Sequence, residues 1–253
     1  MKIPAACTIA LLILGSTQGI SGQGIELFSP AGTIKTTVFL RKNGNLSYTV
    51  SSNGKMVIDS SSLGINLNKT DLGRQVKLGI PKFQEHADSY PVIGVHATAT
   101  NHYCSVTIPV VHQETGIRFQ LEVRAFDNGI AYRYIVPRRG LSTITGEASS
   151  WKIPIGSKAW FQENVFYYEG LYMASDYAGI GRRKIGPPLT YQTPDGNYVL
   201  VSEAALYNYS GMSLQSDGHG LLQAAFVNDP KGWTVKDTIV TPWRLAIISK
   251  DLN

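Results

Sequence analysis

Glu203 is an acidic residue among apolar neighbours, which makes it the first candidate for chemistry in this sequence. Residues 198–214 begin with the period-two alternation of a β-strand. The residues expected on one face of that strand are Val199, Val201, Glu203, Ala205 and Tyr207. An ionised carboxylate in such a row is costly unless a cation meets it. Two interpretations stay open, a structural salt bridge inside a sandwich and a ligand for a metal or substrate.

A dense group of aromatic residues lies between positions 151 and 177. Its members are Trp151, Trp160, Phe161, Phe166, Tyr167, Tyr168, Tyr172 and Tyr177, interrupted by Glu163, Glu169 and Asp176. Aromatic rings stack on the apolar faces of sugars, while carboxylates accept hydrogen bonds from hydroxyl groups. The alternative is that the rings fill the space between sheets or cover an interdomain surface, which we favour for Trp151 and Phe166. The candidate sugar-binding residues are Tyr167, Tyr168, Glu169 and Tyr172.

Other catalytic and metal-binding templates are not found. The spacings of His86, His96, His102 and His112 match no helical pair of ligands and no compact ligand box, so we expect surface or hydrogen-bonded histidines. The sequence has no Gly-x-Ser-x-Gly elbow, His-Glu-x-x-His motif, phosphate-binding loop or Cys-x-x-Cys motif. It therefore offers no complete nucleophilic or metallopeptidase site.

The elements expected to position these residues are β-strands. Asn43-Gly44 and Asn53-Gly54 separate short alternating segments, and Asn-Gly is a strong hairpin signal. A second predicted hairpin turns at Asp127-Asn128-Gly129, with an apolar and a more polar face on each strand. Its Arg124 and Arg133 are expected partners for acids across the sheet, including Glu122 or Glu203.

Composition supports a folded β protein. Of the 253 residues, 43% are hydrophobic and 16% are charged, and no helix-length apolar stripe stands out. The pattern predicts an all-β, two-sheet antiparallel sandwich. The formal net charge is only +5 and the basic residues are scattered, which argues against a nucleic-acid surface. No apolar run is long enough for a membrane span.

Residues 1–23 have the features of a secretory signal. Lys2 supplies a positive end, and residues 5–14 form an apolar run too short to cross a bilayer. We therefore expect an exported protein, periplasmic or extracellular, whose mature domain spans residues 24–253.

Three segments together carry a resemblance to a known family. They are Ser202-Glu203-Ala204-Ala205-Leu206-Tyr207-Asn208-Tyr209-Ser210-Gly211-Met212-Ser213-Leu214, Phe126-Asp127-Asn128-Gly129-Ile130-Ala131-Tyr132-Arg133-Tyr134, and Thr241-Pro242-Trp243-Arg244. In this order they resemble the N-terminal domain of glycoside hydrolase family 97, the α-glucosidases and α-galactosidases. The similarity covers most of residues 25–249.

The resemblance implies a large super-sandwich, similar to galactose mutarotase, that precedes a catalytic (β/α) barrel missing from this chain. It also implies that Glu203 is a calcium ligand extended towards the barrel, and that the catalytic acids lie on that barrel. Ser202 departs from the family, in which His is frequent at this position. Calcium takes six to eight oxygen ligands and one Glu supplies at most two, so this chain alone is expected to bind calcium weakly.

The leading hypothesis for function is a non-catalytic module of a family 97 α-glycosidase. It would contribute to a pocket for α-linked oligosaccharides and provide one calcium ligand to a complementary barrel. Two alternatives remain, a stand-alone sugar epimerase or mutarotase-like enzyme and a truncated orphan fragment of a glycosidase. The epimerase would need a His and a Glu that converge in a cleft.

Overall fold

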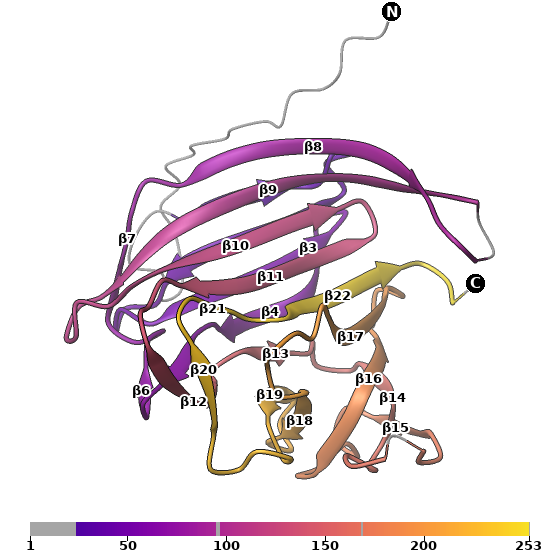
Figure 1. Ribbon diagram of the computed structural model, residues 1–253. Coiled ribbons are helices and arrows are strands. Elements are labelled where there is room, and N and C mark those ends of the chain that lie inside the picture. Colours follow the sequence, from indigo (N-terminus) through magenta and orange to yellow (C-terminus); the bar gives the residue numbers. More distant parts are fainter. Residues whose placement is uncertain (1–23, 95–96, 168, 253) are drawn as a thin grey trace, which may run out of the picture.

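The computed structural model describes residues 24–94, 97–167 and 169–252, and these fold into antiparallel β-strands without a helix (Figure 1). The predicted all-β sandwich is confirmed. The predicted signal at residues 1–23 lies outside the described residues. Within those residues, no helix is long and apolar enough to cross a membrane.

One part of the larger sheet forms the long curved layer at the top and front of Figure 1, and the sheet continues to the lower right of the picture. Its core order is β8–β9–β10–β11–β22–β17–β16–β14–β15, with β7 beside β9 and β21 beside β11. The strands are β7 (Val76–Leu78), β8 (Lys82–Pro91), β9 (Thr98–His112), β10 (Arg118–Phe126), β11 (Gly129–Val136), β14 (Lys158–Gln162), β15 (Met173–Asp176), β16 (Lys184–Gln192), β17 (Tyr198–Ala204), β21 (Ile239–Val240) and β22 (Trp243–Ser249).

The second layer packs behind the first. It runs β1–β2–β3–β4–β13–β19–β18 and rejoins the larger sheet at the start of β16. Its strands are β1 (Ile25–Phe28), β2 (Ile34–Leu40), β3 (Leu46–Ser52), β4 (Lys55–Ser62), β13 (Ser150–Lys152), β18 (Ser213–Ser216) and β19 (Leu221–Ala225).

A small four-stranded sheet completes the fold. Its order is β20–β12–β5–β6, formed by β5 (Ile65–Leu67), β6 (Thr70–Asp71), β12 (Leu141–Glu147) and β20 (Trp233–Lys236). A register shift lies between Ile144 and Gly146 on β12, just before the strand ends at Glu147. Such a bulge changes the direction of the side chains that follow it.

Buried aromatic residues join the two layers. The ring of Tyr132 on β11 lies 5.4 Å from that of Tyr48 on β3 and 6.4 Å from that of Trp151 on β13. The Tyr48 hydroxyl donates to the Ser150 carbonyl at 2.9 Å. Burial raises the pKa of Tyr48 and of Tyr132 well above the ordinary value. The expectation that Trp151 fills the core is confirmed.

The predicted turns form where their residues indicate. Asn53 and Gly54 both have positive φ, 49° and 75°, in the tight turn between β3 and β4. The turn at Asn43-Gly44 is longer, and there only Gly44 has positive φ. The hairpin of β10 and β11 turns at Asp127 and Asn128, as predicted.

The predicted strand around Glu203 extends too far. β17 ends at Ala204, and Ala205 has a φ of 58°, so Ala205 and Tyr207 do not continue the face that holds Glu203. A positive φ takes the chain out of the extended region, which terminates the strand. Val199 and Val201 are buried on that face, as expected.

Candidate functional site

Glu203 faces Arg244 directly across two neighbouring strands. The two residues are paired positions in the register of β17 and β22. The Arg244 Nη1 group donates to Glu203 Oε2, while the backbone N–H of Met212 donates to Glu203 Oε1 at 2.9 Å. The Glu203 side chain is 14% exposed and that of Arg244 is fully buried. Glu203 therefore lies at the rim of a buried ion pair.

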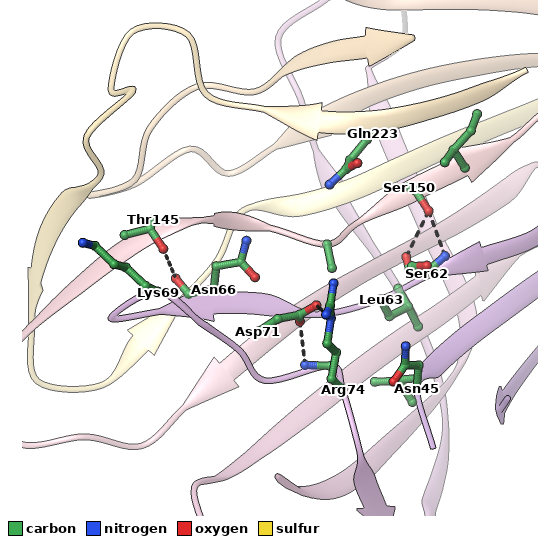
Figure 2. Close-up of a pocket in the computed structure, with 14 residues that line it drawn as sticks. Asn45, Ser62, Leu63, Asn66, Lys69, Asp71, Arg74, Thr145, Ser150 and Gln223 are labelled. Carbon is green, nitrogen blue, oxygen red and sulfur yellow. Dashed lines mark hydrogen bonds and ion pairs between the residues drawn. The ribbon is translucent and has the colours of Figure 1, made fainter. Parts of the chain in front are cut away.

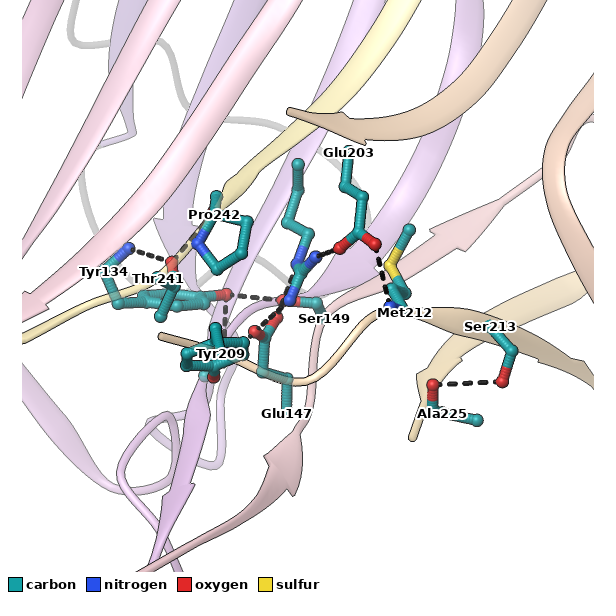
Figure 3. A network of polar contacts seen from close by, with 12 residues as sticks. Tyr134, Glu147, Ser149, Glu203, Tyr209, Met212, Ser213, Ala225, Thr241 and Pro242 are labelled. Atoms are coloured by element: carbon teal, nitrogen blue, oxygen red, sulfur yellow. Dashed lines mark hydrogen bonds and ion pairs between the residues drawn. The ribbon is translucent and has the colours of Figure 1, made fainter. Parts of the chain in front are cut away.

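Glu147 holds the other side of the same guanidinium (Figure 3). Arg244 Nε donates to Glu147 Oε2 at 3.0 Å, and Arg244 Nη2 donates to Glu147 Oε1 at 2.5 Å. This two-point contact suits the planar guanidinium. Both side chains are fully buried. The bulge at the end of β12 directs Glu147 into this position.

Hydroxyl groups satisfy the remaining acceptors of Glu147. Tyr209 donates to Oε1 at 2.9 Å, and Ser149 donates to Oε2 at 2.7 Å. Tyr134 lies 2.9 Å from Ser149 and accepts from the N–H of Gly64 at 2.8 Å. The network links β11, β12, β17 and β22 through one buried cation.

The charges of this network do not cancel. Two carboxylates, Glu147 and Glu203, share one guanidinium, so the formal sum is −1. Burial by itself would lower the pKa of Arg244, but the charges of Glu147 and Glu203 raise it well above the ordinary value. Arg244 thus stays charged. Of the three charged side chains, Glu203 is the one that is partly exposed, so the excess negative charge can meet solvent there.

The arginines predicted as structural partners have that role. Arg124 and Arg133 both bind Glu122, each at 2.8 Å. Both guanidinium groups also stack on the ring of Trp243, at 4.2 and 4.3 Å from its centroid. Glu203 therefore forms its ion pair with Arg244 and not with Arg124 or Arg133.

Three of the four candidate sugar-binding residues lie on a surface segment between β14 and β15. Tyr167, Glu169 and Tyr172 are exposed, and the Tyr172 hydroxyl donates to the Pro188 carbonyl at 3.1 Å. Tyr168 lies outside the described residues. Phe166 is 61% exposed, so it does not fill the space between the sheets, and the other alternative, that it covers an interdomain surface, stays a prediction. It lies in a turn after β14 and not in a strand that faces the second layer.

This segment and Glu203 lie at the same end of neighbouring strands. β16 pairs with β17 up to Leu189 and Val201, and Pro188 and Glu203 lie just beyond that pair. Since Tyr172 contacts Pro188, the aromatic segment is one strand removed from the end of β17 that carries Glu203. The structure brings the two predicted features to one end of the larger sheet.

No ready-made metal centre is found in the described part of the chain. It contains no group of three or more His, Cys, Asp and Glu residues that could hold a metal ion. His102 and Glu85 form a His–Glu pair at 2.9 Å, and both side chains are exposed on the β8–β9 hairpin. Neither residue lines one of the two cavities of the domain that are described next.

A polar cavity of about 600 Å³ opens on another part of the surface (Figure 2). The ion pair between Arg74 and Asp71, 3.1 Å long, lies on its wall, and Ser150 accepts from the N–H of Ser62 at 2.8 Å. None of the residues predicted to bind sugar or metal lines it. A second cavity lies beside Tyr209.

Sequence reasoning missed Arg244, Glu147 and Tyr209 as parts of the site. Arg244 carried a usable signal, because it alternates in phase with Ala246 and Ile248, an apolar face on which an Arg requires an acid. Glu147 carried none, because the bulge that directs it inward is not visible in the pattern.

Comparison with known proteins decides the family. The profile described as "Glycosyl-hydrolase 97 N-terminal" matches residues 27–253. The chain belongs to this family. The resemblance seen in its three sequence segments is thereby confirmed, and the Glu203–Arg244 network belongs to a family 97 N-terminal domain.

Two curated relatives of this domain are α-galactosidases. A probable retaining α-galactosidase of Streptomyces bingchenggensis is 27% identical over 206 residues, which are 81% of this chain and 32% of the relative. A retaining α-galactosidase of Bacteroides thetaiotaomicron is 25% identical over 241 residues, 88% of this chain and 35% of the relative. The family 97 N-terminal domain thus spans about a third of the length of these relatives.

A solved structure confirms the fold. A glycoside hydrolase family 97 enzyme from Pseudoalteromonas, in complex with panose, superposes with a TM-score of 0.82 at 24% identity. The match covers 89% of this chain and 36% of that enzyme.

Proposed function

We propose that this chain is a non-catalytic N-terminal module of a family 97 α-glycosidase. Its role is to complete a pocket for α-linked oligosaccharides and to contribute Glu203 as one calcium ligand. The observation that carries the proposal is the formal charge of −1 on the group formed by Arg244, Glu147 and Glu203. Glu203 is the partly exposed residue of this group.

The chemistry of Glu203 fits one calcium ligand and no more. Each of its oxygens accepts one hydrogen bond, from Met212 or from Arg244, and a carboxylate oxygen has two lone-pair directions. One direction on each oxygen is therefore free for a cation. Calcium needs several further oxygen ligands, and the described residues contain no cluster of three or more His, Cys, Asp and Glu that could provide them. Another part of the complete enzyme would have to supply them.

Exposed apolar side chains near this end of the sheet support a docking role. Leu171 is 91% exposed and Tyr207 is 76% exposed, with Leu206 and Tyr172 also on the surface. Grouped exposed side chains of this size mark interaction sites more often than free surface. We infer that a catalytic barrel domain packs here, with Tyr167, Tyr168, Glu169 and Tyr172 next to the sugar.

The substrate class rests on the relatives. Two are named as α-galactosidases, and one enzyme of the family was crystallised with panose. Export is also part of the proposal, because residues 1–23 have the pattern of a secretory signal.

A chimeric enzyme tests the proposal. Residues 24–253 would replace the matching segment of the Bacteroides thetaiotaomicron α-galactosidase, and hydrolysis of 4-nitrophenyl α-galactoside would be measured against calcium concentration. We expect calcium-dependent hydrolysis, with Glu203→Gln raising the calcium required at least tenfold. Glu122→Gln is the matched control, because Glu122 is also 14% exposed and also bound to arginine.

Two results would count against the module. One is hydrolysis of the α-galactoside by the purified chain without any other domain. The other is an equal calcium requirement in the Glu203→Gln and Glu122→Gln chimeras, which would restrict Glu203 to a structural ion pair.

A further inference from the structure

A cavity of about 490 Å³ lies between the chain that follows β17 and the edge strand β20. Its volume is within the range of small-molecule sites, about 300–1,000 Å³. The residues that line it are Asn208, Tyr209, Ser210, Asp229, Trp233, Thr234, Val235 and Lys236. None of the residues predicted to bind sugar or calcium is among them.

Two aromatic rings meet at a corner of this cavity. The centroids of Tyr209 and Trp233 are 4.8 Å apart and their planes are inclined at 76°. Phe226 supports the indole from a centroid distance of 4.9 Å. Tyr209 is fixed at its other end, since its hydroxyl donates to Glu147. The rings thus form a rigid apolar corner with little conformational freedom to lose on binding.

Polar groups without a protein partner surround these rings. The indole Nε1 of Trp233 is buried and has no hydrogen-bond acceptor in the described residues. The Ser210 hydroxyl donates to Asp229 Oδ2 at 2.5 Å. The second carboxylate oxygen, Oδ1, has no hydrogen-bond partner among the described residues. Because Nε1 has almost no exposed surface, a ligand in the cavity does not reach it while the indole stays in place, and Asp229 Oδ1 is the unpaired polar atom that a ligand hydroxyl can meet.

The edge of β20 adds backbone groups. In the small sheet, β20 pairs with β12 on one side only, so its second edge has no partner strand among the described residues. Peptide N–H and C=O groups on such an edge are available to donate and accept.

The formal charges of the cavity balance. Asp229 and Lys236 contribute one charge of each sign, and the other lining residues are neutral. Neither an anion nor a cation is therefore favoured. Apolar ring faces next to donors and acceptors of both kinds match a neutral ligand with many hydroxyl groups.

We propose that this cavity is a binding subsite for a neutral saccharide, separate from the aromatic segment at residues 163–172. The choice of a saccharide among polyhydroxylated ligands rests on the proposed function, whereas the position of the subsite rests on the cavity alone. One sugar unit would lie against the Tyr209–Trp233 corner, with hydroxyl groups on Asp229 and on the edge of β20.

The test is a titration of the purified chain with panose and with raffinose, followed by calorimetry and by tryptophan fluorescence. We expect saturable binding of at least one trisaccharide. Trp233→Phe and Asp229→Asn should each weaken it at least fivefold. Trp160→Phe is the matched control, because Trp160 is another partly exposed indole, packed on Tyr198 outside the cavity. Melting curves check that each variant is folded.

Asp229→Asn keeps the shape of the side chain, so it remains informative if Trp233→Phe unfolds the protein. Absence of saturable binding up to 50 mM of both sugars would overturn the subsite, and so would binding that neither variant changes. Binding lost only in Tyr172→Ala would also overturn it, while leaving the proposed function intact. Conversely, failure of the calcium-dependent chimera would reject the module without affecting this titration.

Discussion

Glu203 and Arg244 are direct cross-strand partners, although 41 positions separate them in the chain. Arg244 also binds Glu147 through two nitrogens, so one buried cation connects β12, β17 and β22. The structural and the functional interpretations of Glu203 are therefore not exclusive. The ion pair fixes the side chain, and the surplus negative charge is the reason we propose Glu203 as a ligand for a cation.

The two carboxylates of this network should differ in their effect on stability. Glu147→Gln leaves buried Arg244 with one partial partner and is expected to lower the free energy of unfolding by about 3–5 kcal/mol. Glu203→Gln keeps Glu147 as counter-ion and is expected to cost about 1 kcal/mol. Thermal and urea unfolding of both variants measures the difference. Equal losses would contradict the central role of Glu147.

Several features of this fold were predictable because their causes are local. Asn53-Gly54 specifies its turn through positive φ at both residues, and Asp127-Asn128-Gly129 specifies the β10–β11 hairpin. Alternation within one hairpin also gave Arg124 and Arg133 as partners for Glu122 or Glu203, and the structure pairs both with Glu122. In each case the determining residues lie within about a dozen positions of one another.

The site itself depends on non-local contacts. Alternation placed Glu203 on the apolar face but could not choose between Arg124, Arg133 and Arg244, since strand order sets that choice. The bulge of β12 directs Glu147 inward, and a bulge changes the phase of the pattern. The sequence also left two positions open for Phe166, between the sheets or on an interdomain surface, because hydrophobicity alone does not separate a core ring from an exposed one, and the ring is exposed.

The buried tyrosines predict loss of stability in alkali. Burial raises the pKa of Tyr48, Tyr132, Tyr134 and Tyr191 above the ordinary value of 10.0. In the unfolded chain these phenols ionise near pH 10, whereas in the folded chain they stay protonated. Stability is therefore fully present below pH 10 and falls above it, by roughly 1.4 kcal/mol per pH unit for each tyrosine.

Absorbance of phenolate at 295 nm, recorded with circular dichroism between pH 9 and 12, checks this expectation. The buried phenols should ionise together with unfolding. Gradual ionisation of all tyrosines while the β signal persists would show that these hydroxyls are accessible in the folded state.

Tyr172 should contribute to sugar contact without contributing to the core. It is 53% exposed, and among the described residues its hydroxyl binds the Pro188 carbonyl alone. Tyr172→Ala is expected to weaken retention on soluble α-glucan in affinity electrophoresis several-fold and to change the melting temperature by less than about 2 °C. Tyr90→Ala, another half-exposed tyrosine, located on β8, is the control. A lower melting temperature with unchanged retention would show that Tyr172 has a packing role.

Calorimetric titration of the purified chain with calcium measures whether this domain offers the ion a single carboxylate, as we propose for Glu203. With only Glu203 available, the expected dissociation constant is about 1 mM or weaker, and Glu203→Gln should remove the remaining heat. Stoichiometric binding at micromolar calcium would show a complete site within this chain and would contradict a single-carboxylate contribution.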